Sequence, residues 1–401
     1  MKTFDEALHY LLTKSVTTSQ TEKIPVFNAL GRVLAEPIIS TVNVPPHDNS
    51  MMDGYALHSF DLEHNVNFEI SQRIPAGSNP SSLKTGTAAR IFTGAPIPEG
   101  ANLVIMQEET EEQVDGKVKI TTNCATKGQN IRVTGEDIAQ NATILKTGHK
   151  LRSQDLGLIT SIGFAEVSVY KPLKVATFTT GDELVEPGNP LEDGKIYNAN
   201  RYVLAGLVPQ LGFELIDLGQ VEDTLESTIE AMKTAAAQAD VVITTGGVSV
   251  GEEDHIKPAI EKLGGLDMWK VKMKPGKPLA YGDIEGTPFI GLPGNPVSAF
   301  ATFNLFARPY LMKMQGANEI KAKPIWLEAD FEWLKAGFRR EFARARLVNK
   351  QQTSVIDIYP NQGSGVLTST VWADGFVVIP EDTKINKGDK VAFYPFNPVN
   401  E

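Results

Sequence analysis

Between residues 171 and 318 the chain alternates short apolar runs with longer segments whose apolar residues recur at helical spacing. The apolar runs are LKVATFTT, FELIDLG, DVVITT and TPFIGLP, and the helical segments are NRYVLAGLVPQLG, LESTIEAMKTAAAQA and DHIKPAIEKLG. Strands that alternate with helices predict a parallel sheet with right-handed crossovers. A last helix is expected at Pro296, with Asn295 as its cap. The pattern therefore predicts an α/β domain over residues 171–318.

The other regions of the chain have different patterns. Residues 1–40 read as helical before they end in an extended segment, and residues 140–170 hold one short helix between extended pieces. We expect these two regions to form a connecting domain. Residues 41–139 are rich in Gly, Pro, Thr and Val with short β-like runs, which predicts an inserted mostly-β domain. Residues 319–401 return to β-like alternation and predict a C-terminal β domain, so the fold class is α/β plus β with several domains.

Composition narrows the class of protein. The 401 residues carry 38 Lys and Arg against 49 Asp and Glu, a net charge of −11, which argues against a nucleic-acid partner held by bulk positive charge. Cys124 is the single cysteine, which excludes an intramolecular disulfide and a cysteine-cluster metal site. The first residues lack the pattern of a signal peptide, and no apolar run approaches the roughly 18 residues of a membrane span. We expect a cytoplasmic protein without a membrane partner.

Polar clusters follow the strands of the predicted sheet. Thr180 and Gly181 come after the first strand, and Gly246, Gly247 and Ser249 come after the third. Ligands of open parallel sheets bind beyond the carboxyl ends of the strands. Glycine turns near a helix start offer backbone amides to an anion, although a Gly-Gly pair is often only a turn.

Three acids are expected at the same edge of the sheet: Glu183, Asp223 and Asp254. Carboxylates repel a phosphate unless a cation stands between them, and oxygen ligands suit Mg²⁺. These acids are therefore predicted to hold Mg²⁺ beside a phosphate. The simpler interpretation is that Asp223 and Asp254 only cap the helices that follow them.

A lysine-rich stretch, MWKVKMKPGKPLAYG, spans residues 268–282. Strict alternation puts Lys270, Lys272 and Lys274 on the face opposite Val271 and its apolar neighbours. Lysines also protect edge strands against aggregation, which is the alternative explanation. However, Lys274 and Lys277 bring two positive charges together around a Pro-Gly turn, which indicates that an anion binds there. The following segment, GLPGNPVSAF, contains Pro293, Pro296 and Ser298 and predicts a second helix N-terminus that could bind an anion.

Seven segments together resemble the MoeA family, the molybdopterin molybdenumtransferases, to which the gephyrin E domain is related. They lie in order from about residue 45 to 300: PPHDNSMMDGYA, IFTGAPIPEGANLVIMQEE, GQNIRVTGEDI, TTGDEL, TTGGVSVGEEDH, KPGKPLAYG and GLPGNPVSA. The resemblance implies that molybdate is inserted into adenylylated molybdopterin, with Mg²⁺-dependent cleavage of the adenylyl bond and release of AMP. It also implies a homodimer of elongated subunits with a molybdopterin-binding α/β domain, and transient contact with the adenylyltransferase and with acceptor molybdoenzymes.

The resemblance also implies roles for the residues that match the family's motifs. Lys270, Lys274 and the three acids match functional positions, and the TTGGVS turn matches the site of the pterin pyrophosphate. The implied oxyanion pocket consists of Lys274, Lys277, Ser298, Ser364 and one arginine of FRREFARAR, either Arg339 or Arg344.

Two further matching positions, Asp53 and Thr93, lie in the inserted β region. The residue pattern alone explains them as a turn aspartate and a strand end. We expect them to complete the site if a dimer brings this region over the α/β domain of the other subunit.

Two other functions remain open. One is an adenylyltransferase that makes the adenylylated pterin from ATP, and the other is a non-enzymatic scaffold such as gephyrin. The roughly 170 residues before the α/β domain and the predicted lysine–serine pocket favour the molybdenumtransferase.

Overall fold

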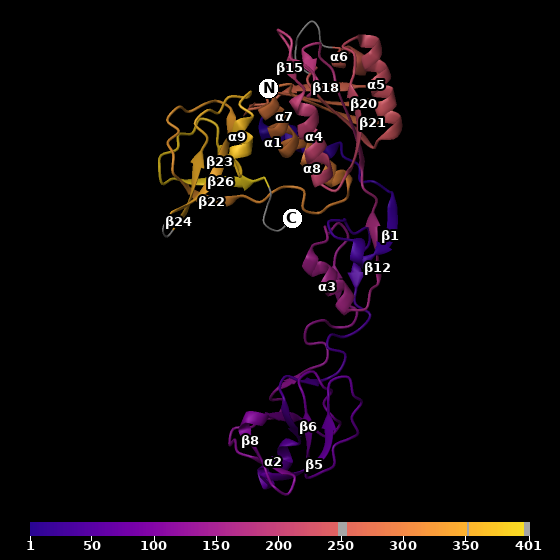
Figure 1. The fold of residues 1–401 in the computed structure, drawn as a ribbon, viewed down its shortest axis with the longest axis vertical. Coiled ribbons are helices and arrows are strands. Elements are labelled where there is room, and N and C mark those ends of the chain that lie inside the picture. Colours follow the sequence, from indigo (N-terminus) through magenta and orange to yellow (C-terminus); the bar gives the residue numbers. More distant parts are fainter. Residues whose placement is uncertain (248–254, 351–352, 397–401) are drawn as a thin grey trace. The chain divides into compact units, whose positions relative to one another are not determined.

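A computed structural model of the chain describes residues 1–247, 255–350 and 353–396 (Figure 1). The chain divides into two compact units. Unit 1 comprises residues 1–36, 147–153 and 166–401, and unit 2 comprises residues 37–146 and 154–165. Across the described ranges, every helix falls short of the length and apolar character that a membrane crossing demands.

The central element of unit 1 is a six-stranded sheet with the order β16-β13-β17-β21-β20-β18. The first four strands are parallel, and β20 runs antiparallel to both of its neighbours. This arrangement confirms the predicted α/β region. The strands are β13 (Lys174–Thr179), β16 (Glu214–Gln220), β17 (Val241–Thr245), β18 (Leu266–Lys270), β20 (Pro278–Ile284) and β21 (Thr287–Leu292).

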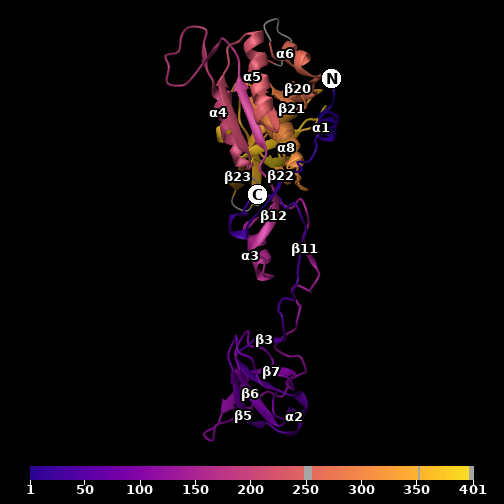
Figure 2. The same cartoon turned by 90° about the vertical axis from the view of Figure 1, so that its right-hand side faces the viewer.

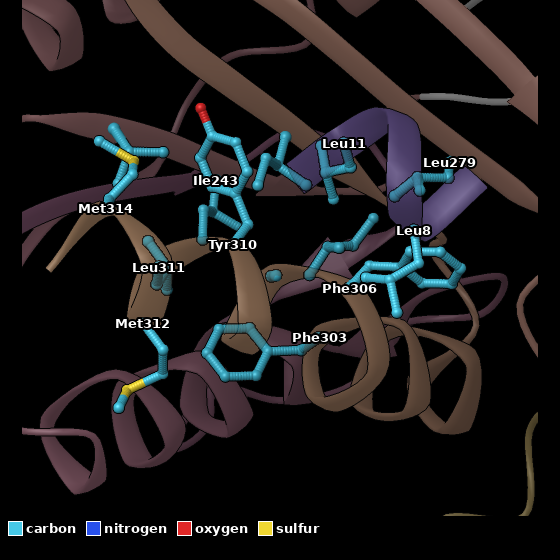
Figure 3. Close-up of a cluster of buried hydrophobic side chains, with 14 of the residues drawn as sticks. Leu8, Leu11, Ile243, Leu279, Phe303, Phe306, Tyr310, Leu311, Met312 and Met314 are labelled. Carbon is cyan, nitrogen blue, oxygen red and sulfur yellow. The ribbon is translucent and has the colours of Figure 1, made fainter. Parts of the chain in front are cut away.

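Helices cover both faces of this sheet. Successive strand residues point to opposite sides, so each strand places apolar side chains on both faces. Val175 and Ile243 belong to one apolar cluster, and their neighbours Ala176 and Val242 belong to the other. Figure 3 shows the first cluster, in which Leu8 lies with residues of the sheet and of the helices after β21. The helices are α1 (Phe4–Thr13), α4 (Ala199–Gln210), α5 (Leu225–Gln238), α6 (Ile256–Leu263), α7 (Pro296–Thr302), a π-helical turn (Phe303–Ala307) and α8 (Arg308–Met314).

The expectation that residues 1–40 are helical is wrong beyond Thr13. A strand, β1 (Thr21–Pro25), pairs antiparallel with β12 (Glu166–Tyr170), and a 3₁₀ turn follows at Val26–Asn28. The strand partner of β1 lies about 140 residues later in the sequence, so the local pattern could not reveal it. Asn295 occupies the predicted cap position of α7, but its side chain makes no capping hydrogen bond.

The C-terminal region forms a closed barrel. Its strands pair in the order β23-β24-β22-β26-β25, and β25 pairs again with β23. A sixth strand, β19 (Met273–Lys274), joins in parallel to β23 and therefore links the lysine-rich stretch to the barrel. The elements are β22 (Ile325–Ala329), β23 (Arg340–Lys350), β24 (Thr353–Ile358), α9 (Thr368–Trp372), β25 (Gly375–Ile379) and β26 (Lys390–Pro395).

Unit 2 contains its own six-stranded sheet, with the order β7-β4-β6-β5-β9-β8, part of which is seen in Figure 2. Two short ladders accompany it, β2–β11 and β3–β10. The elements of unit 2 are β2 (Ile38–Ile39), β3 (Asn49–Ser50), β4 (Gly54–Leu57), α2 (Ser59–His64), β5 (Asn67–Ile74), β6 (Thr87–Ile91), β7 (Leu103–Met106), a 3₁₀ turn (Gln107–Glu109), β8 (Thr110–Glu112), β9 (Lys117–Ile120), β10 (Ile131–Arg132), β11 (Thr143–Leu145) and α3 (Ser153–Ser161). The first residue of α3, Ser153, still belongs to unit 1.

Candidate active site

A cavity of about 630 Å³ lies in unit 1, where the ends of β13, β17 and β21 approach the barrel. Ten residues predicted as site residues line it: Thr180, Glu183, Gly246, Lys274, Lys277, Pro293, Pro296, Ser298, Arg339 and Ser364. The other lining residues are Leu184, Ile196, Tyr197, Asn198, Ala199, Asn200, Thr245, Pro275, Gly276, Pro278, Gly294, Asn295 and Gln362. Residues about 185 positions apart in sequence thus share one cavity.

Seven of the other predicted residues that the structure describes do not line this cavity. Gly181, Asp223, Gly247, Lys270 and Arg344 lie elsewhere in unit 1. Asp53 and Thr93 belong to unit 2. Ser249 and Asp254 fall outside the described residues.

Glycines fix two of the turns that form the cavity wall. Gly246 ends β17 with φ +83°, and its amide donates to the carbonyl oxygen of Leu292 at 3.0 Å. Gly276 has φ +96°, and a Cβ there would lie 2.5 Å from Thr302 Oγ1. L-residues rarely adopt this backbone region. The turn that carries Lys274 and Lys277 is therefore held against α7 by a position that requires glycine.

The predicted alternation of the lysine-rich stretch is confirmed. Val271 and Met273 are fully buried in the core, whereas Lys270 is exposed. Lys270 lies on β18, the edge strand of the sheet, as the protected-edge interpretation expects. Lys274 lines the cavity instead, because the chain passes from β18 to the barrel strand β19 between them.

Three cations line the cavity, and one of them has an acidic partner. Lys274 Nζ lies 3.0 Å from a carboxylate oxygen of Glu341. Arg339 stacks on Phe338 at 5.6 Å from the ring centroid. Within the part of the chain that the structure describes, neither Lys277 nor Arg339 pairs with an acid. The negative charge expected beside Lys274 is thus supplied, at least for this lysine, by the Glu341 carboxylate.

The two candidate arginines occupy different environments. The Arg344 side chain is buried, with the whole residue 1% exposed. Its Nε donates to Ser369 Oγ at 3.0 Å, and its Nη2 donates to the carbonyl oxygen of Gly363 at 3.1 Å. Burial lowers the pKa of Arg344 to about 10. Arg344 therefore fastens the loop that carries Ser364, while Arg339 is the arginine that reaches the cavity.

The helix-cap interpretation of Asp223 is wrong. Thr224 is the cap residue of α5, and its Oγ1 accepts a hydrogen bond from the amide of Ser227 at 3.2 Å. The Asp223 carboxylate is thus left for another role.

Asp223 lies among other ionisable groups. Burial raises the pKa of Asp223, His255 opposes the rise, and the carboxylates of Asp182 and Glu183 add to it. The carboxylates of Asp223 and Glu183 therefore repel each other at one edge of the sheet. A divalent cation would relieve this repulsion, and carboxylate oxygens are suitable Mg²⁺ ligands. Among the described residues alone, no group of three or more His, Cys, Asp or Glu side chains is arranged to hold a metal.

The wall formed by residues 196–200 was not predicted from the sequence. Asn200 Nδ2 donates to the carbonyl oxygen of Gly294 at 2.7 Å, which ties the start of α4 to the loop after β21. Its Oδ1 is buried without a partner among the described residues. Asn198 Nδ2 donates to Thr179 Oγ1 at 2.8 Å. The available signal was the polar run YNAN at a helix start after the first strand, a common ligand position.

Asp53 and Thr93 lie together in unit 2. Asp53 Oδ1 accepts hydrogen bonds from the Thr93 amide at 2.8 Å and from its hydroxyl at 2.9 Å. These bonds lower the pKa of Asp53, with a further contribution from Arg90. Asp53 is therefore ionised and oriented by Thr93.

Three family regions match the chain in order. They are the MoeA N-terminal region (domain I and II) over residues 2–163, the probable molybdopterin binding domain over residues 176–313, and the MoeA C-terminal region (domain IV) over residues 327–396. The molybdopterin molybdenumtransferase of Haemophilus influenzae is 40% identical over 402 residues, which cover 99% of each chain. Molybdopterin molybdenumtransferase 2 of Mycobacterium tuberculosis is 34% identical over 371 residues, covering 90% of this chain and 91% of its own. The crystal structure of the MoeA molybdopterin biosynthesis protein from Pyrococcus horikoshii OT3 superimposes with a TM-score of 0.85 at 31% identity, covering 98% of this chain and 100% of that one.

Proposed function

The chain belongs to the MoeA family, and from this membership we propose that it is a molybdopterin molybdenumtransferase of molybdenum cofactor biosynthesis. The observation that carries the proposal is the cationic lining of the cavity. Lys274, Lys277 and Arg339 line it together with the buried Ser298 at the start of α7. A compact, doubly charged oxyanion such as molybdate fits this combination of charge and hydroxyl groups.

The lining from the sheet and α4 suits the second substrate, adenylylated molybdopterin. The start of α4, whose cap residue Asn198 makes no capping hydrogen bond, presents backbone amides to the cavity beside Thr180. Such amides favour phosphate groups. We expect the pterin and its phosphates to lie here, so that the dithiolene faces the oxyanion and the adenylyl bond is held in place.

Magnesium is proposed at the edge of the sheet. Glu183 and Asp223 supply oxygen donors of the right chemistry, and a divalent cation between them would offset the repulsion of their carboxylates. Asp254, outside the described residues, is the third proposed ligand. When bound, Mg²⁺ neutralises phosphate charge. The lysines that line the cavity perform the same task, and the turns orient the substrate.

AMP release tests the proposed reaction. Purified protein is incubated with adenylylated molybdopterin, Mg²⁺ and molybdate, and AMP is followed by chromatography. We expect release that depends on molybdate and stops with EDTA. Formation of AMP-pterin from ATP and free molybdopterin, without AMP release, would instead indicate the adenylyltransferase. Inactivity in both assays would indicate a non-enzymatic scaffold.

A matched pair of lysine variants ties the reaction to the cavity. Lys277→Ala removes a cavity cation and should lower molybdate-dependent AMP release at least tenfold. Lys323→Ala removes an exposed lysine that pairs with Glu319 away from the cavity, and it should behave as wild type. Equal activity of the two variants would exclude Lys277 from the site.

The active form is proposed to be a cytoplasmic homodimer in which Asp53 and Thr93 of one subunit complete the site of the other. Mixed dimers of Asp53→Ala and Asp254→Ala subunits should recover one intact site and part of the wild-type activity. No recovery above the two parent variants would contradict sharing of the site.

A further inference from the structure

The barrel supplies an acid to one of the three cations that line the cavity. β19 pairs in parallel with β23, and the register places Lys274 directly beside Glu341. The two side chains form an ion pair with Nζ and the carboxylate oxygen 3.0 Å apart. The Lys274 side chain is 41% exposed and lines the cavity, whereas that of Glu341 is 14% exposed and lies behind it. The pair therefore sits at the wall of the cavity, with the lysine on the inner side.

Glu341 also acts electrostatically on a second cation, the buried Arg344 three residues further along the same strand. Burial lowers the pKa of Arg344, and the charge of Glu341 opposes part of that lowering. Glu341 therefore keeps a favourable electrostatic partner even when Lys274 turns away. In contrast, the other two cavity cations, Lys277 and Arg339, lack an acidic partner in the described ranges.

This asymmetry has a consequence for ligand binding. An incoming oxyanion meets two cations that are available and one that is already paired. To bind Lys274 it must compete with Glu341, and the carboxylate repels any anion that settles beside the lysine. Because the pair is shielded from solvent on the Glu341 side, this repulsion is less screened than between surface charges.

We propose that Glu341 is an internal counter-ion. It pairs with Lys274 when no oxyanion is bound, and it thereby limits the affinity of the cavity for the oxyanion substrate. The inference rests on the proposed function for the identity of that oxyanion. A ligand held too tightly before reaction adds nothing to the rate once the site is filled, and it slows exchange. Glu341 is thus a positioning residue that acts through Lys274, and it is expected to set the Michaelis constant for molybdate more than the turnover number.

Calorimetric titration with molybdate alone tests this inference. Glu341→Gln removes the charge but keeps a hydrogen-bond acceptor for Lys274, so the dissociation constant for molybdate should fall about tenfold, equivalent to about 1.4 kcal/mol. Glu341→Asp keeps the charge but lengthens the contact, so it should bind about threefold more tightly than wild type. In the AMP-release assay both variants should lower the Michaelis constant for molybdate without raising the turnover number.

The matched control is Asp330→Asn. Asp330 is an acid of the same barrel with an 18% exposed side chain, and it pairs with Lys350 and Lys387 away from the cavity. It should leave molybdate binding unchanged. Weaker binding by both Glu341 variants would overturn the inference, since it would mean that Glu341 only holds Lys274 in place.

Unchanged binding by the Glu341 variants would also overturn it, provided that the wild type binds molybdate. If the wild type does not bind molybdate alone, the inference about Glu341 fails, and the AMP-release assay decides the proposed function separately. If the glutamine variant fails to fold, the aspartate variant decides the matter, because it must still bind more tightly than wild type.

Discussion

Replacing Arg344 with methionine separates the two candidate arginines by their physical roles. The methionine keeps much of the volume of the side chain but removes its charge and its donors. The structure assigns Arg344 to the loop around Ser364, because its guanidinium donates to Gly363 and Ser369. We therefore expect the substitution to loosen this loop, and to affect the cavity only through it.

The magnitude follows from the two lost hydrogen bonds, at 3.0 and 3.1 Å. A hydrogen bond to a charged group contributes roughly 1.5–3 kcal/mol. Removing a buried charge recovers part of this, since the charge no longer has to be desolvated. The net loss of local stability should then be about 2–4 kcal/mol. Because about 1.4 kcal/mol is a factor of ten, amide exchange by local opening should accelerate roughly 30- to 700-fold.

Hydrogen exchange followed by mass spectrometry measures this effect. The reporter is the peptide of residues 359–373, whose amides at Tyr359 and Ala373 are bonded to the carbonyl oxygens of Arg344 and Ser369. Arg339→Met is the control, because Arg339 lacks an acidic partner among the described residues. It should leave exchange unchanged and weaken molybdate binding by about 10- to 100-fold, the loss of one charged contact.

The opposite pattern would refute this reasoning. If Arg344→Met left exchange of the 359–373 peptide unchanged and abolished molybdate binding, Arg344 would be the oxyanion ligand. Arg339 would then be the arginine without a functional role in the cavity.

Three further predictions concern local features. Gly276→Ala adds a Cβ 2.5 Å from Thr302 Oγ1 at a positive φ, so it should displace the lysine turn and lower the rate of AMP release more than tenfold. Thr224→Ala removes the cap of α5 and should cost about 1 kcal/mol of unfolding free energy, seen as a lower midpoint in denaturant. Thr93→Val removes one of the bonds that lower the pKa of Asp53, so a carboxylate NMR titration should show that pKa rising toward its model-compound value of 3.8. In the wild type, the stabilisation from this bond should be present above that value and disappear as the pH falls through the lowered pKa of Asp53.

The architecture around the site could be predicted to a large extent from the sequence. Apolar runs alternating with helical segments gave the parallel sheet, because burial on both faces leaves a pattern within each strand. The rule that ligands bind at the carboxyl ends of such strands then brought Thr180 and Gly246 together without any distance information. Alternation likewise separated Lys274 from Met273, and the motifs identified the family.

The assignment of individual side chains depended on the tertiary structure, for the physical reason that it rests on partners distant in sequence. Glu341, 67 residues after Lys274, neutralises it through a strand pairing that no local pattern reveals. Burial and hydrogen bonding, not sequence spacing, distinguish Arg344 from Arg339. Similarly, β1 reads as part of a helical region until its partner strand is known. Local periodicity predicted the elements of the α/β region, and long-range pairing decided which of their charges face the cavity.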